Sequence, residues 1–318
     1  MSPPQYPGSR GRGGFPFPQR RQPARGQQRP TFGRSMGGGL KVRLLIALAI
    51  AAFAFISYYM KPGDVNETTG ETERVAMTDE AQEIQLGLQA APKMVSQHGG
   101  PTRSAADQDL VDRVGWRLLE ALNQDLERYN QQHPEADRKN PYLGAFQFTL
   151  LADRKTVNAF ALPGGKVFVT HALYDQLETE GQLAGVLGHE VGHVIMRHGN
   201  KRMAKQGLYQ GLAGAMGVLG GGGQGGQMGQ MIASALSMKY GRDHELESDD
   251  WGVKLCGLAG YDPRAMKGVM LILEKAAGGG KGPPEFMSTH PKPANRVEFI
   301  EKAIQKYYPS GIPDGLRP

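Results

Sequence analysis

Cysteine is almost absent from this chain of 318 residues, which contains Cys256 alone. A single cysteine excludes an intrachain disulfide and a metal site built from clustered thiolates. The redox state of the compartment stays open, because export does not require disulfides. No repeat of fixed period is apparent either, so nothing points to a solenoid or a propeller.

Acidic residues are missing from residues 1–43, which carry nine Lys and Arg and are rich in Pro, Gly and Gln. Such a composition cannot bury a core, and we expect residues 1–39 to be a disordered tail. The whole chain carries a formal charge of +6, so residues 44–318 carry −3. The RGG-like run at 10–15 would suit RNA or anionic lipid, but a determinant of membrane topology is the simpler interpretation, and no nucleic-acid partner is expected.

Charge is also absent from residues 44–60, which read LLIALAIAAFAFISYYM. Seventeen helical residues span about 25 Å, slightly less than the hydrocarbon core of a bilayer. Basic residues precede the run and two tyrosines end it, so we expect residues 40–60 to contact the lipid bilayer as a transmembrane anchor. A buried core helix and a cleaved signal peptide are the alternatives, and the run ends in a poor cleavage site. By the positive-inside rule the tail stays cytoplasmic and the rest is exported.

Residues 186–198 read VLGHEVGHVIMRH and place His189 and His193 four residues apart. On an α-helix these two side chains share one face and can bind one metal ion, with Glu190 beside them as a general base. Gly188 and Gly192 have no side chains, which would let another element pack closely against the ligand face. The alternative is a surface helix with scattered histidines.

A catalytic zinc site needs a third protein ligand. A third histidine six residues after the second is excluded, because Gly199 stands there. His198 is one residue short, and we expect it to support the site rather than to bind the metal. In RDHELESDDWG, residues 242–252, Glu245 and Asp249 are four apart and share a face. Glu245 can therefore bind the metal while Asp249 accepts the outer N–H of a ligating histidine.

Five motifs follow one another along the chain in an order that resembles a known family. They are NAFALPGG at 158–165 with VFV at 167–169, LAGVLGHE at 183–190 with His193, Arg242 with ELESD at 245–249, AGYDP at 259–263, and STHP at 288–291 with Arg296. Together they resemble the membrane-associated zinc endopeptidases related to the CAAX prenyl protease, which include the bacterial HtpX and BepA peptidases. The resemblance covers about residues 75–308, and its two departures, Gly241 and Ser248, remove no ligand.

The resemblance implies one zinc ion per chain, held by His189, His193 and Glu245, with Glu190 as the catalytic base. Zinc rather than another divalent metal is inferred from ligation by two histidines and a glutamate. His290 has three interpretations: a stabiliser of the oxyanion, a gate that fills the open metal position, or a plain loop histidine.

The apolar pattern predicts helices over most of 78–131, with a break at 99–101, and strands at 146–151 and 167–170. Residues 211–229, GLAGAMGVLGGGGQGGQMG, are expected to be a flexible connector, acting as a lid, a membrane-grazing loop or a plain insertion. The predicted architecture is α+β and mainly helical, with a zincin-like metallopeptidase domain and a small β-sheet at 75–308. The disordered tail and the transmembrane helix precede this domain. A polar linker at 61–74 joins the transmembrane helix to the domain, and a C-terminal tail follows at 309–318.

These observations predict a membrane-anchored zinc endopeptidase that hydrolyses unfolded, damaged or misassembled envelope proteins with metal-activated water and Glu190 as base. Its catalytic domain would face the periplasm in a bacterium. Protein substrates would bind as an extended strand along the Phe160–Val169 region, with Asn158, Phe160, Gly164 and Gly165 as the candidate edge. One alternative is a metal-binding, chaperone-like quality-control or assembly factor with little turnover, and another is a membrane protein that binds RNA through its tail. The complete set of catalytic residues favours the peptidase.

Overall fold

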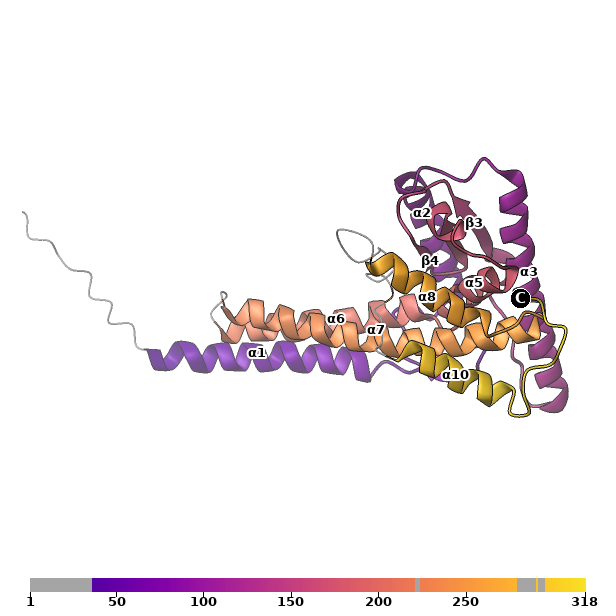
Figure 1. The fold of residues 1–318 in the computed structure, drawn as a ribbon. Coiled ribbons are helices and arrows are strands. Elements are labelled where there is room, and N and C mark those ends of the chain that lie inside the picture. Colours follow the sequence, from indigo (N-terminus) through magenta and orange to yellow (C-terminus); the bar gives the residue numbers. More distant parts are fainter. Residues whose placement is uncertain (1–35, 221–223, 279–289, 291–294) are drawn as a thin grey trace, which may run out of the picture.

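The computed structural model describes residues 36–220, 224–278, 290 and 295–318. A long helical arm projects from a mainly helical body, which confirms the predicted α+β class (Figure 1). The arm consists of α1 (Met36–Tyr59), α6 (His198–Leu219) and the first half of α7 (Gln224–Leu258). The body holds α2 (Glu80–Gln97), α3 (Ala105–Gln132), α4 (His171–Tyr174), α5 (Glu180–Ile195), α8 (Ala265–Gly278), α10 (Arg296–Tyr307) and two small sheets. Most of the predicted disordered tail, residues 1–35, lies outside the described residues.

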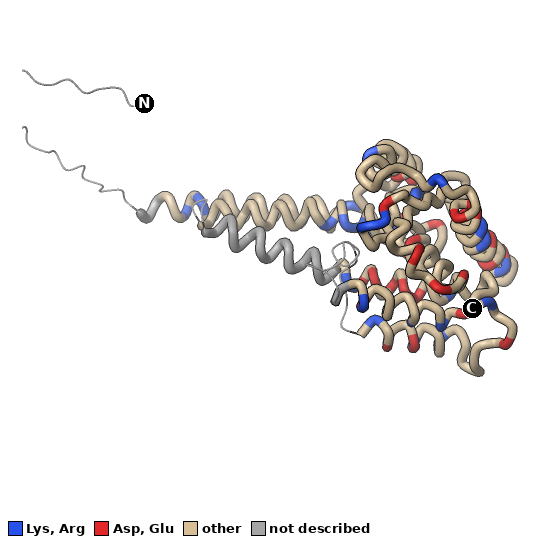
Figure 2. Tube along the Cα trace, turned by 45° about the horizontal axis from the view of Figure 1, so that its top comes forward, with Lys and Arg blue, Asp and Glu red and all other residues tan. Residues whose placement is uncertain are grey.

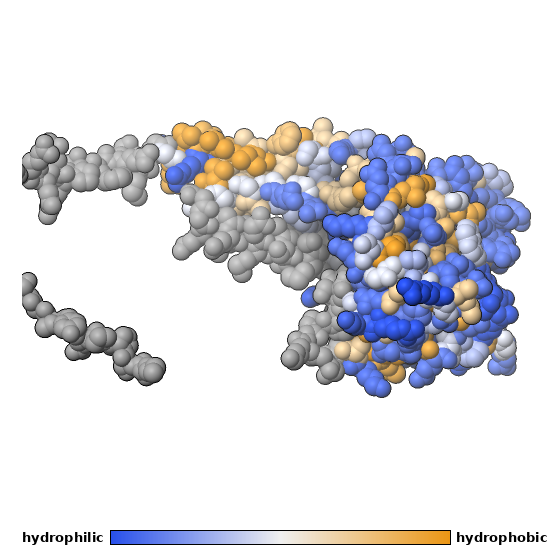
Figure 3. Space-filling model, turned by 90° about the horizontal axis from the view of Figure 1, so that it is seen from above, coloured by the Kyte–Doolittle hydropathy of each residue, from blue (hydrophilic) through white to orange (hydrophobic). Residues whose placement is uncertain are grey.

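Helix α1 presents apolar side chains to its surroundings along most of the arm. Within the described residues, Gly39–Tyr59 alone is long and apolar enough to cross a membrane, with a mean hydropathy of 2.2. Only 11% of its most apolar window is buried against protein. Figure 2 shows the middle of this helix free of charge, and Figure 3 shows hydrophobic surface gathered over it. A lone buried core helix is therefore excluded, because a core helix would be covered by protein on all sides.

The glycine-rich stretch 211–229 is helical rather than the expected flexible connector. Residues 211–219 complete α6 and residues 224–229 begin α7, while residues 221–223 lie outside the described part. The two helices run side by side along the arm (Figure 1). Glycine costs an isolated helix about 1 kcal/mol per residue, which is why the local sequence argues against a helix. Here it permits close packing, because a Cβ added to Gly211 would lie 2.4 Å from the Cβ of Ala54 in α1.

A three-stranded sheet flanks the centre of the body, with strand order β3-β5-β4. Strands β3 (Gln147–Leu151) and β5 (Lys166–Thr170) are parallel and confirm the two predicted strands. Strand β4 (Ala159–Leu162) pairs antiparallel with β5 and forms one edge of the sheet. The tight connection between β4 and β5 uses Gly164 and Gly165, whose φ angles of +76° and +99° suit glycine.

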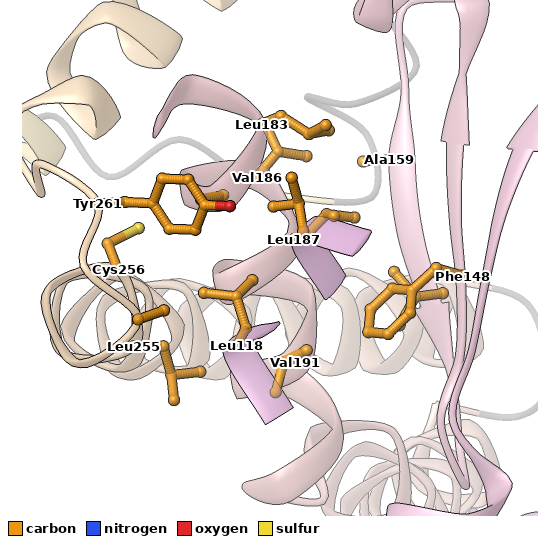
Figure 4. Packing of buried hydrophobic residues seen from close by; sticks show 14 of the residues in the cluster. Leu118, Phe148, Ala159, Leu183, Val186, Leu187, Val191, Leu255, Cys256 and Tyr261 are labelled. Atoms are coloured by element: carbon orange, nitrogen blue, oxygen red, sulfur yellow. The ribbon is translucent and has the colours of Figure 1, made fainter. Parts of the chain in front are cut away.

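Helix α5 runs through the middle of the body and carries the HEVGH sequence. Thr179 caps its start by accepting the N–H of Gln182 at 3.2 Å. Apolar residues around the helix pack against α3 and α7 (Figure 4), among them Leu183, Leu187, Val191, Leu118 and Leu255. Burial on all sides fixes the helix rigidly, which suits a helix that must hold ligands in place.

Two glycines of α5 allow α7 to cross it at very short range, as the sequence predicted. A Cβ added to Gly188 would lie 3.3 Å from the Cα of Gly252, and one added to Gly192 would lie 3.2 Å from the Cα of Ser248. Both contacts involve backbone, so a larger side chain would push the helices apart. This crossing sets Glu245 and Asp249 of α7 beside the histidines of α5.

Residues 61–74, expected to be a polar linker, fold onto the end of α5. Strands β1 (Asp64–Val65) and β2 (Thr72–Glu73) form a small antiparallel hairpin. Asn66 Nδ2 donates to the carbonyl oxygen of Ile195 at 2.8 Å. The C-terminal segment is also held, because Gly181 N–H donates to Pro318 O at 2.8 Å. Polar residues here serve as partners for distant backbone, which the local sequence pattern does not reveal.

Arg197 joins α5 to α6 and is the one described non-glycine residue with a positive φ, 52°. Its side chain is 1% exposed and pairs with Asp64 and, at 2.7 Å, with Glu83 of α2. Burial raises the pKa of Glu83, and Arg197 opposes that rise. The left-handed backbone costs roughly 1 kcal/mol or more, which these buried charge-assisted bonds offset.

Replacing Arg197 by Ala is expected to lower the free energy of unfolding by about 3–5 kcal/mol, because Glu83 would be left buried without its cation. Denaturant unfolding of the detergent-solubilised chain measures this. Arg154→Ala is the matched control, since Arg154 pairs with Asp175 at the surface and its loss should cost less than about 1 kcal/mol. Equal losses in the two variants would contradict a structural role for the buried network.

Candidate metal centre

Four side chains from three parts of the chain converge below the sheet. His189 and His193 come from α5, Glu245 comes from α7, and His290 lies beyond α8, and their ligand atoms all lie within 4.8 Å of one another. His189 Nε2 and His193 Nε2 are 3.1 Å apart, and each lies 3.4 Å from a carboxylate oxygen of Glu245. His290 Nδ1 lies 3.3 Å from His189 Nε2 and 3.1 Å from Glu245 Oε2.

These separations fit a tetrahedral metal site. With metal–ligand bonds of about 2.0–2.2 Å, the edges of a tetrahedron measure roughly 3.3–3.6 Å, close to the distances between the four side chains. The donors are imidazole and carboxylate, which suit zinc. His189, Glu245 and His290 are each at most 4% exposed. Such a cluster of converging lone pairs in a dry interior is stable only around a cation or a proton.

Asp249 fixes the orientation of His189, as the sequence predicted. His189 Nδ1 lies 2.9 Å from Asp249 Oδ1, so this nitrogen donates and the opposite nitrogen, Nε2, faces the cluster. Burial alone would lower the pKa of His189, but hydrogen bonds to Asp249 and Glu245 outweigh it and raise the pKa to about 9. The inner nitrogen therefore carries either a proton or a metal ion, and metal binding must displace the proton.

Arg296 of α10 completes the support of Asp249. Its Nη2 donates to Asp249 Oδ1 at 2.6 Å and its Nε donates to Oδ2 at 2.8 Å. Burial would raise the pKa of Asp249, but Arg296 and His189 hold it below its ordinary value. The sequence reading placed Arg296 in a motif without giving it a role, and the bidentate contact supplies one: it keeps the carboxylate ionised and oriented.

His198 contacts His193, the second histidine of α5. Its Nε2 lies 2.8 Å from Glu247 Oε2 and its Nδ1 lies 2.9 Å from His193 Nδ1. Burial, reinforced by the neighbouring histidines, lowers the pKa of His198 well below its ordinary value, so the ring is neutral. Glu247 accepts from Nε2, so Nδ1 accepts from His193 and leaves His193 Nε2 aimed at the cluster. Sequence reasoning missed this chain of contacts because it gave roles only to Glu245 and Asp249 of this segment.

Glu190 stands beside the cluster with a buried carboxylate that has no hydrogen-bond donor among the described residues. Its Oε1 lies 3.5 Å from His290 Nε2. Glu190 also lines a cleft of about 240 Å³ together with His193, His290 and part of β4. A buried carboxylate without a hydrogen-bond donor is costly, and a position facing a cleft next to a candidate metal cluster is where a proton acceptor would be needed.

The edge of β4 runs along this cleft, and its free backbone groups differ from the predicted ones. The backbone oxygen of Asn158 accepts a hydrogen bond from Thr170 N, so the backbone groups of Asn158 face β5. By the alternation of an antiparallel ladder, the backbone groups of Phe160 also face β5, while those of Ala159 and Ala161 face away from β5. Gly164 and Gly165 lie in the turn rather than on the edge. Of the predicted Phe160–Val169 region, only β4 is an edge, because β5 is the central strand.

His290 is not a plain loop histidine, because it is buried inside the cluster. While its Nδ1 faces the other donors, its Nε2 lies 3.2 Å from the carbonyl oxygen of Ala159 and donates to it. The neighbouring residues of its predicted motif, 288, 289 and 291, lie outside the described part of the chain. The two remaining interpretations, oxyanion stabiliser and gate, both place this ring at the cleft.

Comparison with known proteins identifies the family of the chain. The sequence pattern of Peptidase family M48 matches residues 120–304. The chain belongs to peptidase family M48. The matched region contains both histidines of α5, Glu190 and Glu245, and it confirms the family resemblance seen in the sequence.

Several named proteins resemble the chain over part of their length. The mitochondrial metalloendopeptidase OMA1 of Arabidopsis thaliana is 33% identical over 201 residues, 62% of this chain and 40% of that protein. The putative beta-barrel assembly-enhancing protease of Vibrio cholerae is 28% identical over 210 residues, 63% of this chain and 40% of that protein. The mitochondrial metalloendopeptidase OMA1 of Bos taurus is 26% identical over 277 residues, 83% of this chain and 50% of that protein. The chain thus spans half or less of the length of these relatives.

Asp249→Asn is expected to weaken zinc binding by roughly 10- to 100-fold, because His189 would lose the anion that orients it. Competition with a chromogenic chelator measures the affinity. Asp250→Asn is the matched control, since Asp250 is the next residue along α7 and binds Lys306 and Tyr307 instead. Unchanged affinity in Asp249→Asn, or equal loss in both variants, would contradict the role given to Asp249.

Proposed function

We propose that the protein is a membrane-anchored, zinc-dependent endopeptidase with His189, His193 and Glu245 as metal ligands and Glu190 as the catalytic base. The observation that carries the proposal is the buried Glu190 carboxylate, which lies between the donor cluster and the cleft and has no hydrogen-bond donor among the described residues. Membership in family M48 and relatives named as metalloendopeptidases support it. When bound, zinc supplies a Lewis acid that polarises the scissile carbonyl and activates water at neutral pH.

The side chains of this chain then divide the remaining work. Glu190 takes a proton from the attacking water and passes it to the leaving amine, which its lack of hydrogen-bond donors leaves it free to do. Asp249 with Arg296, and His198 with Glu247, keep the two ligating rings in fixed tautomers. Burial of the cluster excludes bulk water, which strengthens each of these interactions.

Substrates would bind as an extended strand against the edge of β4. Ala161 of β4 lines the cleft together with Phe160 and Leu162, and pairing through the main chain demands little from substrate side chains. Such recognition suits unfolded, damaged or misassembled proteins, because these expose long stretches of unpaired backbone. The similarity to a Vibrio cholerae protein named as a putative beta-barrel assembly-enhancing protease is consistent with envelope proteins as substrates.

His290 would occupy both places that a substrate needs. Its Nδ1 stands where a fourth donor to the metal belongs, and its Nε2 uses the free carbonyl of Ala159 on the substrate edge. A peptide strand that pairs with Ala159 must displace His290, and the same displacement opens the metal. We therefore favour the interpretation of His290 as a gate over its interpretation as an oxyanion stabiliser. A chaperone-like factor with little turnover would show the same closed arrangement.

The anchor in the proposal is α1, with the basic residues before it on the cytoplasmic side and the body on the exported side. In a bacterium the body would lie at the periplasmic face of the inner membrane.

Glu190→Gln in the full-length, detergent-solubilised chain is expected to keep its zinc and lose at least about 100-fold in the rate of cleavage of unfolded casein. Metal analysis and a fluorescent casein assay measure the two properties. Glu180→Gln, in the first turn of the same helix, is the control and should retain activity. If the wild type holds zinc yet cuts no more than Glu190→Gln, the chaperone-like alternative is favoured.

His290→Ala is expected to raise basal casein cleavage, because the fourth position and the Ala159 carbonyl would both be free. The three remaining ligands should still hold zinc, with some loss of affinity. His133→Ala, a histidine at the end of α3 far along the chain from the cleft, is the control. A large fall in kcat with unchanged zinc content would instead identify His290 as the oxyanion stabiliser.

A further inference from the structure

The arm contains a second long segment without charge besides α1. Residues 206–238 include no Asp, Glu, Lys, Arg or His over 33 positions. Residues 206–219 form the second part of α6 and residues 224–238 form the first part of α7, and these helices lie side by side (Figure 1). Basic residues border it: Lys201, Arg202 and Lys205 precede it, and Lys239 and Arg242 follow it.

Helix α6 is packed directly against the predicted anchor. Ala47 and Ala54 of α1 are 3% and 5% exposed and form a stripe of small residues seven apart on one face. Gly211 of α6 meets Ala54 at a distance that leaves no room for a side chain. The helices run in opposite directions (Figure 1), so the eight residues from Gly211 to Leu219 reach about 12 Å back along α1, to the level of Ile46.

We propose that the α6–α7 pair lies in the lipid bilayer beside α1. The inference rests on the anchor proposed above: if α1 crosses the membrane, a helix packed on its middle lies at the same depth. The outer face of α1 is apolar and exposed, with Leu45 at 68% and Phe53 at 75% (Figure 3). Figure 2 shows α1 without charge between the basic residues at its start and the charged body.

The pair need not insert by itself. Five glutamines in residues 206–238 make its transfer into lipid less favourable than that of α1. The charge-free part of α6, residues 206–219, spans only about 21 Å. A helix pair that packs on an existing span through glycine and alanine gains van der Waals contact and can satisfy polar groups between helices. Length and hydropathy alone therefore select α1 and overlook the pair.

This placement puts the metal centre close to the membrane surface. Glu245 follows the last residue of the charge-free segment by seven positions in the same helix, or about 10 Å. His193 lies just before Arg197, where α6 begins. Both ligand-bearing helices thus lead directly into the bilayer-embedded pair, and the cleft would meet segments of substrate that leave the membrane.

Fluorescence quenching in phosphatidylcholine vesicles tests the proposal with the full-length chain. Gly214→Cys carries an environment-sensitive maleimide dye, because a side chain there would meet nothing within 4 Å. Phe53→Cys on α1 is the lipid reference and Leu271→Cys, at a residue 64% exposed on α8, is the water reference. Cys256 is fully buried and burial raises its pKa to about 12, so the native thiol should not react.

We expect doxyl-labelled phosphatidylcholine to quench the dye at Gly214 as strongly as at Phe53, and aqueous iodide to quench only the dye at Leu271. Leu219→Cys provides a second position on α6 and should behave like Gly214. If iodide quenches the dye at both α6 positions while lipid quenches it at Phe53, the proposal is overturned and the anchor stays intact. If neither agent quenches the dye at the α6 positions, a second protein copy covers them, and the proposal is overturned as well. Iodide quenching at Phe53 would overturn the anchor too, while the Glu190→Gln assay tests the peptidase independently.

Discussion

The close crossing of α5 and α7 is the constraint on which the metal centre depends. Neither helix alone offers a complete site: α5 carries two histidines and a glutamate, and α7 carries Glu245 and Asp249. The backbones approach to van der Waals contact only because Gly188 and Gly192 face Gly252 and Ser248. A larger residue at either glycine would move Glu245 away from both imidazoles, and a displacement of about 1 Å is enough to disrupt a ligand geometry.

Around this crossing, each group of the centre is oriented by another that is distant in the sequence. Asp249 holds His189 and is itself held by Arg296 of α10, while Glu247 and His198 hold His193. The carboxylates remain ionised in a dry interior because cationic or N–H donors face them from several elements. The exception is Glu190, whose oxygens receive no such donor among the described residues. This lack of a hydrogen-bond donor is what distinguishes Glu190, the proposed proton acceptor, from the residues proposed to position the ligands.

The sequence was informative where chemistry depends on spacing within one helix. The four-residue spacing of His189 and His193, the carboxylate pair on α7 and the glycines of α5 all led to the arrangement that the structure shows. It misled where the outcome depends on packing between distant segments. Residues 211–229 favour a loop by propensity, yet residues 211–219 and 224–229 are helical, with Gly211 packed on Ala54 of α1. Residues 61–74 also have distant partners, as Asn66 and Ile195 show with a separation of 129 positions. The place of His290 also depends wholly on tertiary structure, since nothing in its motif indicates its contact with Ala159.

The junction at Arg197 explains how the arm and the metal centre are held relative to each other. The hairpin that directly follows α1 binds Arg197 through Asp64 and binds the last turn of α5 through Asn66, while α6 begins at the next residue. The end of the ligand-bearing helix is therefore attached both to the chain leaving α1 and to the helix packed on α1. A flexible linker at 61–74 would have let the body rotate freely about the anchor. Instead, the contacts of Asp64 with Arg197 and of Asn66 with Ile195 fix the direction of α5 relative to the axis of the arm. They thereby also fix the direction in which the cleft opens.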